Sequence, residues 1–149
     1  LLVFTSSYNS YDVSVDINSF APNFEISKLG NHFKLSETRG NYVIVNFWTS
    51  DDAEARIRNI HYDRFFKSIG NNIGFISVNF DDSDNMFKEL VKTDGLSERS
   101  QFYEKDGAES EVYKRYRLKG GMNSYLLDKD GKILAINPTQ QQLTKYFCQ

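Results

Sequence analysis

The stretch that decides the fold runs from residue 35 to residue 56 and reads LSETRGNYVIVNFWTSDDAEAR. Its centre, Tyr42–Trp48, is a nearly continuous apolar run rich in β-branched residues, which predicts a strand buried on both faces. A polar tetrapeptide follows, and a helical pattern then continues to about Ser68. Ser50 or Asp51 suits the N-cap of that helix, and acidic residues in its first turn suit the helix dipole. We expect the buried face of the helix to be apolar and to consist of Ile57, Ile60, Phe65, Phe66 and Ile69.

Strands and helices alternate on both sides of this stretch. Residues 24–26 and 32–35 alternate around Leu29-Gly30-Asn31, a pattern typical of a β-hairpin. Downstream we expect a strand, a helix, a short strand, a helix, two strands and a last helix. The first of these helices is capped by residues 81–83 and closes near Gly95, and the other elements are expected at residues 73–80, 101–103, 109–116, 123–127, 132–136 and 138–147. This order predicts an α/β fold whose sheet has a parallel portion, helices on both faces and an antiparallel hairpin at one edge.

Composition fixes the broad class of protein. The chain has 149 residues, of which 40% are hydrophobic, so it can build one sizeable core. We assign residues 21–149 to one domain and residues 1–20 to a tail or marginal strand with weak alternation at Val13, Val15 and Ile17. The net charge of −2 gives no basic field for nucleic acid. No apolar run approaches the ~20 residues that a membrane span needs.

Cys148 is the only cysteine, and its position limits the chemistry. A single thiol excludes an internal disulfide, a thiolate-rich zinc site and dithiol chemistry within one chain. We expect Cys148 to be a small buried side chain, with an intermolecular disulfide as the alternative. We predict no metal and no cofactor, because the chain has only two histidines and its acidic runs at residues 81–84 and 128–131 fit a helix cap and a turn better than a calcium loop.

Four segments carry a family resemblance: Ala21-Pro22-Asn23-Phe24, residues 35–48, residues 116–120 (YRLKG) and residues 124–133 (SYLLDKDGKI). In this order, the chain resembles envelope thiol-disulfide oxidoreductases and the peroxiredoxin-like superfamily around them, over residues 21 to about 136. The resemblance implies a thioredoxin-like fold with three α/β/α layers, a central mixed sheet and an extra N-terminal β-hairpin.

The resemblance breaks at the residues that would carry the chemistry. The family pattern after the tryptophan is A-x-W-C-x-x-C-R, whereas Trp48 is followed by TSDDAEAR. Matching the two places Asp52 at the attacking cysteine and Ala55 at the resolving cysteine, and the peroxiredoxin pattern T-x-x-C also falls on Asp52. The family's cis-proline falls on Met122, where we expect a trans bond or a rebuilt loop, because a cis bond before a non-proline residue costs ~2.5–4 kcal/mol.

These departures favour a binding role over catalysis. Thiol exchange needs a thiolate nucleophile and a sulfur leaving group, and a carboxylate supplies neither. We therefore interpret Asp51 and Asp52 as helix-capping residues and the chain as a redox-inactive domain that binds a protein or peptide. The groove beside the former active site would be formed by Trp48, Thr49, Asp51, Asp52, Gly121, Met122 and Asn123.

The sequence is also compatible with two other functions. The chain could be a thiol-disulfide oxidoreductase or peroxidase-type enzyme with a non-standard residue set, or with Cys148 supplied between chains, or a domain kept for structure within a larger assembly. The resemblance and the apolar start Leu1–Phe4 imply a cell-envelope location, periplasmic or anchored through a lipid upstream. That start lacks the basic residues of a complete signal peptide, so an edge strand or a tail fits it equally well. The sequence assigns no oligomeric state.

Overall fold

A central mixed sheet organises the structure, a computed structural model that describes residues 15–28 and 31–148. Its strand order is β5-β4-β3-β6-β7, with β3 (Val43–Trp48) in the middle. β4 (Phe75–Asn79) and β5 (Gln101–Tyr103) continue the sheet in parallel on one side of β3. β6 (Ser124–Leu127) and β7 (Ile133–Ile136) continue it in antiparallel on the other. The predicted parallel portion and the antiparallel hairpin at one edge are confirmed.

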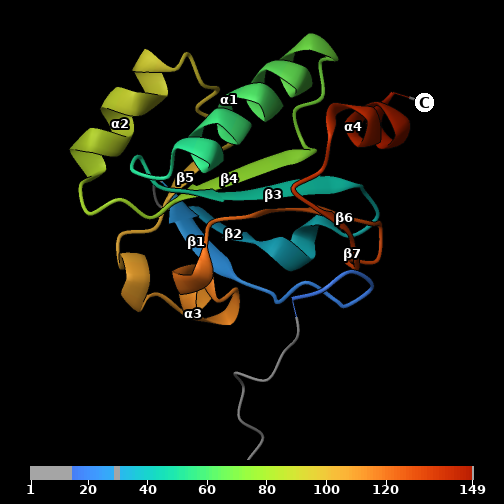
Figure 1. Cartoon of the computed structure of the whole chain (residues 1–149), viewed down its shortest axis with the longest axis horizontal. Helices are drawn as coiled ribbons and strands as arrows, with labels where there is room; N and C mark the ends of the chain where they lie inside the picture. Colours follow the sequence, from blue (N-terminus) through green and yellow to red (C-terminus); the bar gives the residue numbers. More distant parts are fainter. Residues whose placement is uncertain (1–14, 29–30, 149) are drawn as a thin grey trace, which may run out of the picture.

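Helices and a separate hairpin cover the two faces of the sheet (Figure 1). On one side lie the three helices α1 (Ala53–Ser68), α2 (Asp84–Thr93) and α4 (Gln140–Phe147). On the other side lie helix α3 (Glu111–Arg115) and the antiparallel hairpin of β1 (Glu25–Lys28) and β2 (Asn31–Lys34). Short 3-10 turns occur at Leu35–Thr38, Gly107–Glu109 and Leu118–Gly120. The predicted three layers and the N-terminal hairpin are confirmed.

Strand β3 is buried along its whole length because successive side chains face the two covered sides of the sheet. Ile44 joins an apolar cluster with Tyr62 and Phe66 of α1. Phe47 faces the opposite layer, where its ring lies 6.0 Å from Phe24 and 4.6 Å from Tyr116. Full burial of an aliphatic or phenylalanine side chain contributes about 1.5–3 kcal/mol. The apolar run therefore fixes β3 as the centre of the fold.

Several elements are shorter than the sequence predicts, and local contacts explain where they begin. The expected helix at 109–116 is reduced to α3, because the 3-10 turn ends at Glu109 and Ser110 then caps α3 through Tyr113 N. The last helix begins at residue 140 because Thr139 and Gln142 form a capping box, each side chain accepting a hydrogen bond from the other residue's backbone N–H.

The buried face of α1 is the clearest error of the sequence analysis. Ile57 is 51% exposed and Ile69 36% exposed, whereas Asn59 and Asp63 are buried at 0% and 2%. Phe65 and Phe66 are buried as expected. Apolar periodicity mislocated the face because two of the positions that point inward carry polar side chains with partners of their own.

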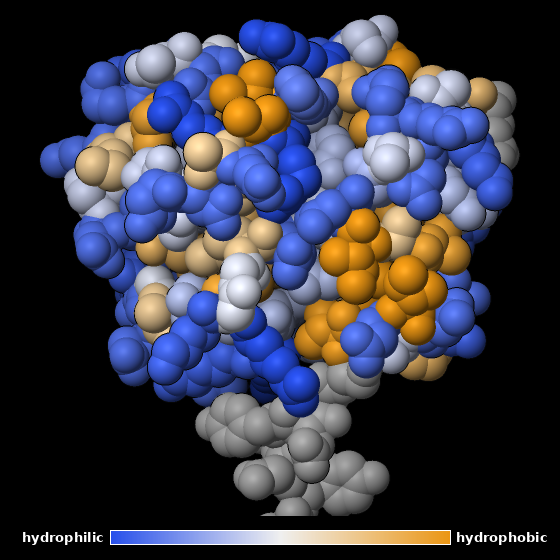
Figure 2. All heavy atoms as spheres, viewed as in Figure 1, coloured by the Kyte–Doolittle hydropathy of each residue, from blue (hydrophilic) through white to orange (hydrophobic). Residues whose placement is uncertain are grey.

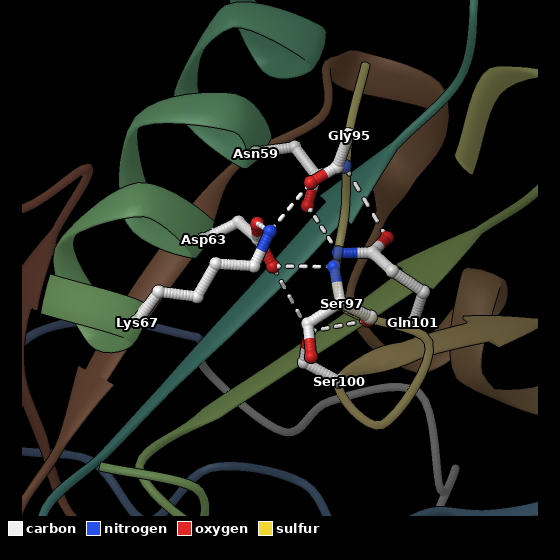
Figure 3. Close-up of polar contacts among 7 residues, drawn as sticks. All are labelled: Asn59, Asp63, Lys67, Gly95, Ser97, Ser100 and Gln101. Carbon is white, nitrogen blue, oxygen red and sulfur yellow. Dashed lines mark hydrogen bonds and ion pairs between the residues drawn. The ribbon is translucent and has the colours of Figure 1, made fainter. Parts of the chain in front are cut away.

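Those partners come from the segment that leads into β5, as Figure 3 shows. The side-chain amides of Asn59 and Gln101 bond each other twice, with N–O distances of 3.2 and 3.0 Å. The Asp63 carboxylate accepts hydrogen bonds from Ser97 N at 2.9 Å and from Ser100 Oγ at 3.5 Å, and it pairs with Lys67 Nζ at 2.7 Å. Buried polar groups are tolerated when they are satisfied in this way. The contacts fix α1 against the edge of the sheet.

The N-terminal end of the described chain runs along the outer edge of β7. Backbone bonds join Asn18 N to Ile133 O and Ile133 N to Ser19 O, and Phe20 forms a β-bridge with Lys132. Phe20 is 56% exposed, and Ile136 of β7 is also exposed. Figure 2 shows hydrophobic surface gathered on this side of the molecule, over β7. The predicted position at residue 13 lies outside the described residues.

Candidate functional site

Asp52 lies where the polypeptide leaves the central strand and enters α1. It is the N-cap of the helix, with extended backbone angles, and its carboxylate accepts a hydrogen bond from Ala55 N at 3.1 Å. Its carbonyl accepts the first helical bond, from Arg56 N at 3.0 Å. A carboxylate at an N-cap satisfies a free backbone N–H and complements the helix dipole. The expected capping role is confirmed for Asp52, while Ser50 and Asp51 lie before the cap.

The loop before Asp52 is held by a carboxylate from the neighbouring strand. Asp81, which follows β4 and is 8% exposed, accepts hydrogen bonds from Ser50 N at 2.9 Å and Ser50 Oγ at 3.0 Å. Its second oxygen accepts from Asn79 Nδ2 at 2.9 Å. The N-cap of α2 is Ser83, so Asp81 contributes to this loop and not to a helix cap. No sequence pattern predicts this link, because Ser50 and Asp81 are 31 residues apart in the chain.

Asp51 points away from the helix cap. It is exposed, and Thr49 Oγ1 donates a hydrogen bond to its Oδ1 at 2.5 Å. Thr49 itself is partly buried. Asp51 and Thr49 therefore lie at the surface beside Asp52, where the groove was predicted.

The loop at residues 121–123 meets the end of β3. Asn123 O accepts a hydrogen bond from Phe47 N at 3.1 Å, and Met122 shares an apolar cluster with Trp48 and Ala55. Trp48 is 0% exposed and Met122 is 9% exposed. The structure thus brings the predicted groove residues of β3 and of this loop together. Trp48 and Met122 lie beneath the surface, and the groove itself stays a prediction.

The peptide bond at Met122 is trans, as expected, since there are no cis bonds among the described residues. Arg58 of α1 donates a hydrogen bond from Nη2 to Met122 O at 2.7 Å. Gly121, before it, is exposed and has a φ of 142°, a backbone conformation that favours glycine. Arg58 therefore anchors the loop to the first half of α1, a contact that the sequence analysis missed.

The surroundings of the loop after β4 are acidic. Burial raises the pKa of the Tyr103 hydroxyl, and the charges of Asp84, Asp82 and Asp81 raise it further. These groups lie at the carboxyl ends of β4 and β5. Within residues 15–28 and 31–148, no group of three or more His, Cys, Asp or Glu side chains is arranged to hold a metal ion.

Cys148 lies far from this site. It is exposed, so the expectation of a buried thiol is wrong. The preceding residue, Phe147, packs against Phe65 and Phe66 near the end of α1, with ring centroids 6.4 and 4.8 Å apart. Thirteen residues of helix at 1.5 Å each separate Phe65 from Asp52, about 20 Å. The thiol cannot reach the N-cap of its own chain.

The fold and the position of the helix cap define a protein of the thioredoxin-like class. A family model described as the AhpC/TSA family matches residues 17–136, and the chain belongs to this family. Thiol-disulfide oxidoreductase ResA of Bacillus cereus (strain ATCC 10987 / NRS 248) is 28% identical over 148 residues, covering 94% of this chain and 82% of the relative.

Solved structures agree with this assignment. A thioredoxin-like protein from Parabacteroides distasonis ATCC 8503 is 33% identical with a TM-score of 0.73, over 88% of this chain and 93% of the other. A thiol-disulfide oxidoreductase from Bacteroides fragilis NCTC 9343 is 27% identical with a TM-score of 0.67, over 85% of this chain and 96% of the other. No helix in the described part of the chain has the length and apolar character to cross a membrane.

Proposed function

We propose that this chain is a redox-inactive member of its family that binds a protein or peptide in the cell envelope. One observation carries the proposal: the residue that begins α1 is an aspartate whose carboxylate caps the helix. The helix start that would lower the pKa of a cysteine thiol here stabilises a carboxylate, which has no thiol chemistry. The envelope location rests on the relatives, which are thiol-disulfide oxidoreductases, and on the sequence resemblance.

The absence of redox activity is tested by two assays on the whole chain. We expect no reduction of insulin disulfides and no consumption of hydrogen peroxide above the rate without protein. The alternative is an enzyme in which Cys148 acts between chains, since this thiol is exposed. Turnover that disappears in the Cys148→Ser variant would establish that alternative and refute redox inactivity.

The placement of the former active site has a separate test. In the double variant Asp52→Cys/Ala55→Cys, we expect the two thiols to form a disulfide under mild oxidation, because the cap geometry brings residue 52 back onto the first turn. The shifted pair Ala53→Cys/Arg56→Cys lies wholly within the helix, where Cβ atoms three residues apart are about 5–6 Å from each other, wider than the ~3.5–4.5 Å of a disulfide. Equal oxidation of both pairs, or oxidation of the shifted pair alone, would show that the site is misplaced.

Binding at the exposed surface beside Asp52 is tested with matched charge reversals. Asp51→Arg changes that surface, and Asp130→Arg changes another exposed residue, in the turn between β6 and β7. We expect proteins captured from an envelope extract by the unmodified chain to be retained by Asp130→Arg and lost by Asp51→Arg. Retention of the same proteins by Asp51→Arg would place the binding surface elsewhere.

A further inference from the structure

An open groove lies between the second half of α1 and the beginning of α4. Its volume is about 450 Å³, and it is lined by His61, Arg64, Phe65, Ser68 and Gln140. The groove is shallow and opens widely to solvent, so it suits an extended chain that lies along the surface better than an enclosed small molecule. Arg64 is twelve helical residues from Asp52, about 18 Å along α1, so the groove is distinct from the helix-cap site.

Arg64 differs from the other basic residues of α1. Arg56 forms two bonds to the Asp94 carboxylate, at 2.9 and 2.7 Å, and Lys67 pairs with Asp63. Arg58 donates to Met122 O. Arg64 is exposed and has neither a hydrogen-bond partner nor an ion-pair partner within the described residues. A guanidinium with a free fork of donors is suited to bidentate recognition of an oxyanion.

Among the described residues, no carboxylate lines the groove beside Arg64. None of the residues that line the groove is acidic, and residues 137–149 contain neither Asp nor Glu. The acidic residues that raise the pKa of Tyr103 lie instead at the ends of β4 and β5. Although the chain carries a net charge of −2, this groove is locally cationic. It also borders the N-terminus of α4, the positive end of that helix dipole.

The remaining walls supply polar and apolar contacts beside the charge. His61 is exposed and lacks a partner among the described residues, and its ring carries an N–H donor in either tautomer. The hydroxyl of Ser68 is already used, since it donates to Phe65 O at 2.6 Å. Phe65 is buried at 8% exposed, and its edge contributes a narrow apolar strip to the groove. A ligand that fits these walls has a carboxylate next to an apolar group.

We infer that this groove binds an acidic segment of a protein partner in which glutamate or aspartate alternates with apolar residues. A carboxylate of the segment accepts hydrogen bonds from Arg64 and His61, and the adjacent apolar side chain packs on Phe65. The proposal does not depend on the helix-cap site. Variants altered at Asp51 or Asp52 are expected to bind the acidic segment in this groove as the unmodified chain does.

The test is an amide-shift NMR titration of the whole chain with the peptide Glu-Leu-Glu-Leu-Glu and its counterpart Gln-Leu-Gln-Leu-Gln. We expect the glutamate peptide alone to give saturable shifts, centred on the amides of residues 61, 64, 68 and 140. Arg64→Gln is expected to weaken the affinity about tenfold or more, because it removes charge-assisted hydrogen bonds. Arg99→Gln, at another exposed arginine, is the matched control and is expected to change it less than twofold.

Several results would each overturn the inference. They are equal binding of the two peptides, an equal loss in Arg64→Gln and Arg99→Gln, shifts centred on other residues, and no shift up to 5 mM peptide, a concentration at which even an affinity of about −4 kcal/mol would be visible. Shifts of the same amides on raising the protein concentration without peptide would assign the groove to a second copy of this chain and also refute it.

Discussion

Replacing Asp63 with alanine tests whether the polar contacts under α1 hold the helix in place. The carboxylate is 2% exposed and accepts from Ser97 N at 2.9 Å and from Lys67 Nζ at 2.7 Å. Removing it leaves the Ser97 N–H without a protein acceptor, which costs about 1–3 kcal/mol. Loss of the ion pair adds at most about 1 kcal/mol, because the Lys67 side chain is 47% exposed and returns to water. Ser100 Oγ adds little, since it also donates to Ser97 O at 3.1 Å.

We therefore expect Asp63→Ala to lower the free energy of unfolding by about 3 kcal/mol, measured by urea denaturation. Two milder variants separate the contributions. Asp63→Asn keeps an oxygen that accepts from Ser97 N and loses only the ion pair, so we expect a loss of about 1 kcal/mol. Lys67→Ala also removes the bond to Gly95 O and is expected to cost about 1–2 kcal/mol.

The relative losses of stability in the three variants show which contact of Asp63 matters most. If Asp63→Asn were as damaging as Asp63→Ala, the ion pair and not the hydrogen bond to Ser97 N would be the main contribution. A loss below about 1 kcal/mol for Asp63→Ala would mean that water or a shifted loop replaces the acceptor, and the contacts in Figure 3 would not fix the helix.

Three further predictions concern stability and use the same measurement. Asp52→Ala is expected to cost about 1 kcal/mol through loss of the N-cap, whereas Asp51→Ala, outside the cap, changes stability by less than about 0.5 kcal/mol. Burial raises the pKa of the Tyr116 hydroxyl far above its ordinary value, so the unfolded chain loses this proton near pH 10 while the folded chain keeps it. The free energy of unfolding should therefore fall above about pH 10, by up to about 1.4 kcal/mol per pH unit from this group. Tyr116→Phe should make this fall with pH less steep, and an equally steep fall in the variant would exclude Tyr116 as its source. Gly74→Ala places a methyl 2.6 Å from the Phe66 ring and is expected to cost about 1–3 kcal/mol, while Gly120→Ala meets open space and serves as the control.

The fold was predictable because its decisive signals are local. The apolar run that becomes β3 specifies a doubly buried strand without reference to any distant residue. The capping role of Asp52 was also predictable, although the sequence pattern located the N-cap one or two residues early. Boundaries at this scale depend on which side chain reaches a free backbone N–H, and several adjacent polar residues can do so.

What could not be predicted depends on pairs of residues brought together by the fold. Ile57 has the right periodicity for a core position, yet it faces solvent, while Asn59 and Asp63 face inward. Their burial becomes favourable only because Gln101 and Ser97 arrive from another part of the chain. The link between Arg58 and Met122 O has the same origin. A hydrophobicity pattern cannot detect a polar residue that is satisfied by a distant partner.

The aspartate at residue 52 bears on which side chains the start of α1 can stabilise. The start of α1 has free backbone N–H groups and the positive end of a helix dipole, the two features that make a thiolate more stable there. The same features stabilise a carboxylate, and an aspartate also accepts a hydrogen bond in the cap, here from Ala55 N. Replacing a cysteine by aspartate at this position would therefore remove reactivity while strengthening the helix start. The reverse change, Asp52→Cys, should regain a reactive thiol and lose about 1 kcal/mol of stability, so the two properties oppose each other at a single residue.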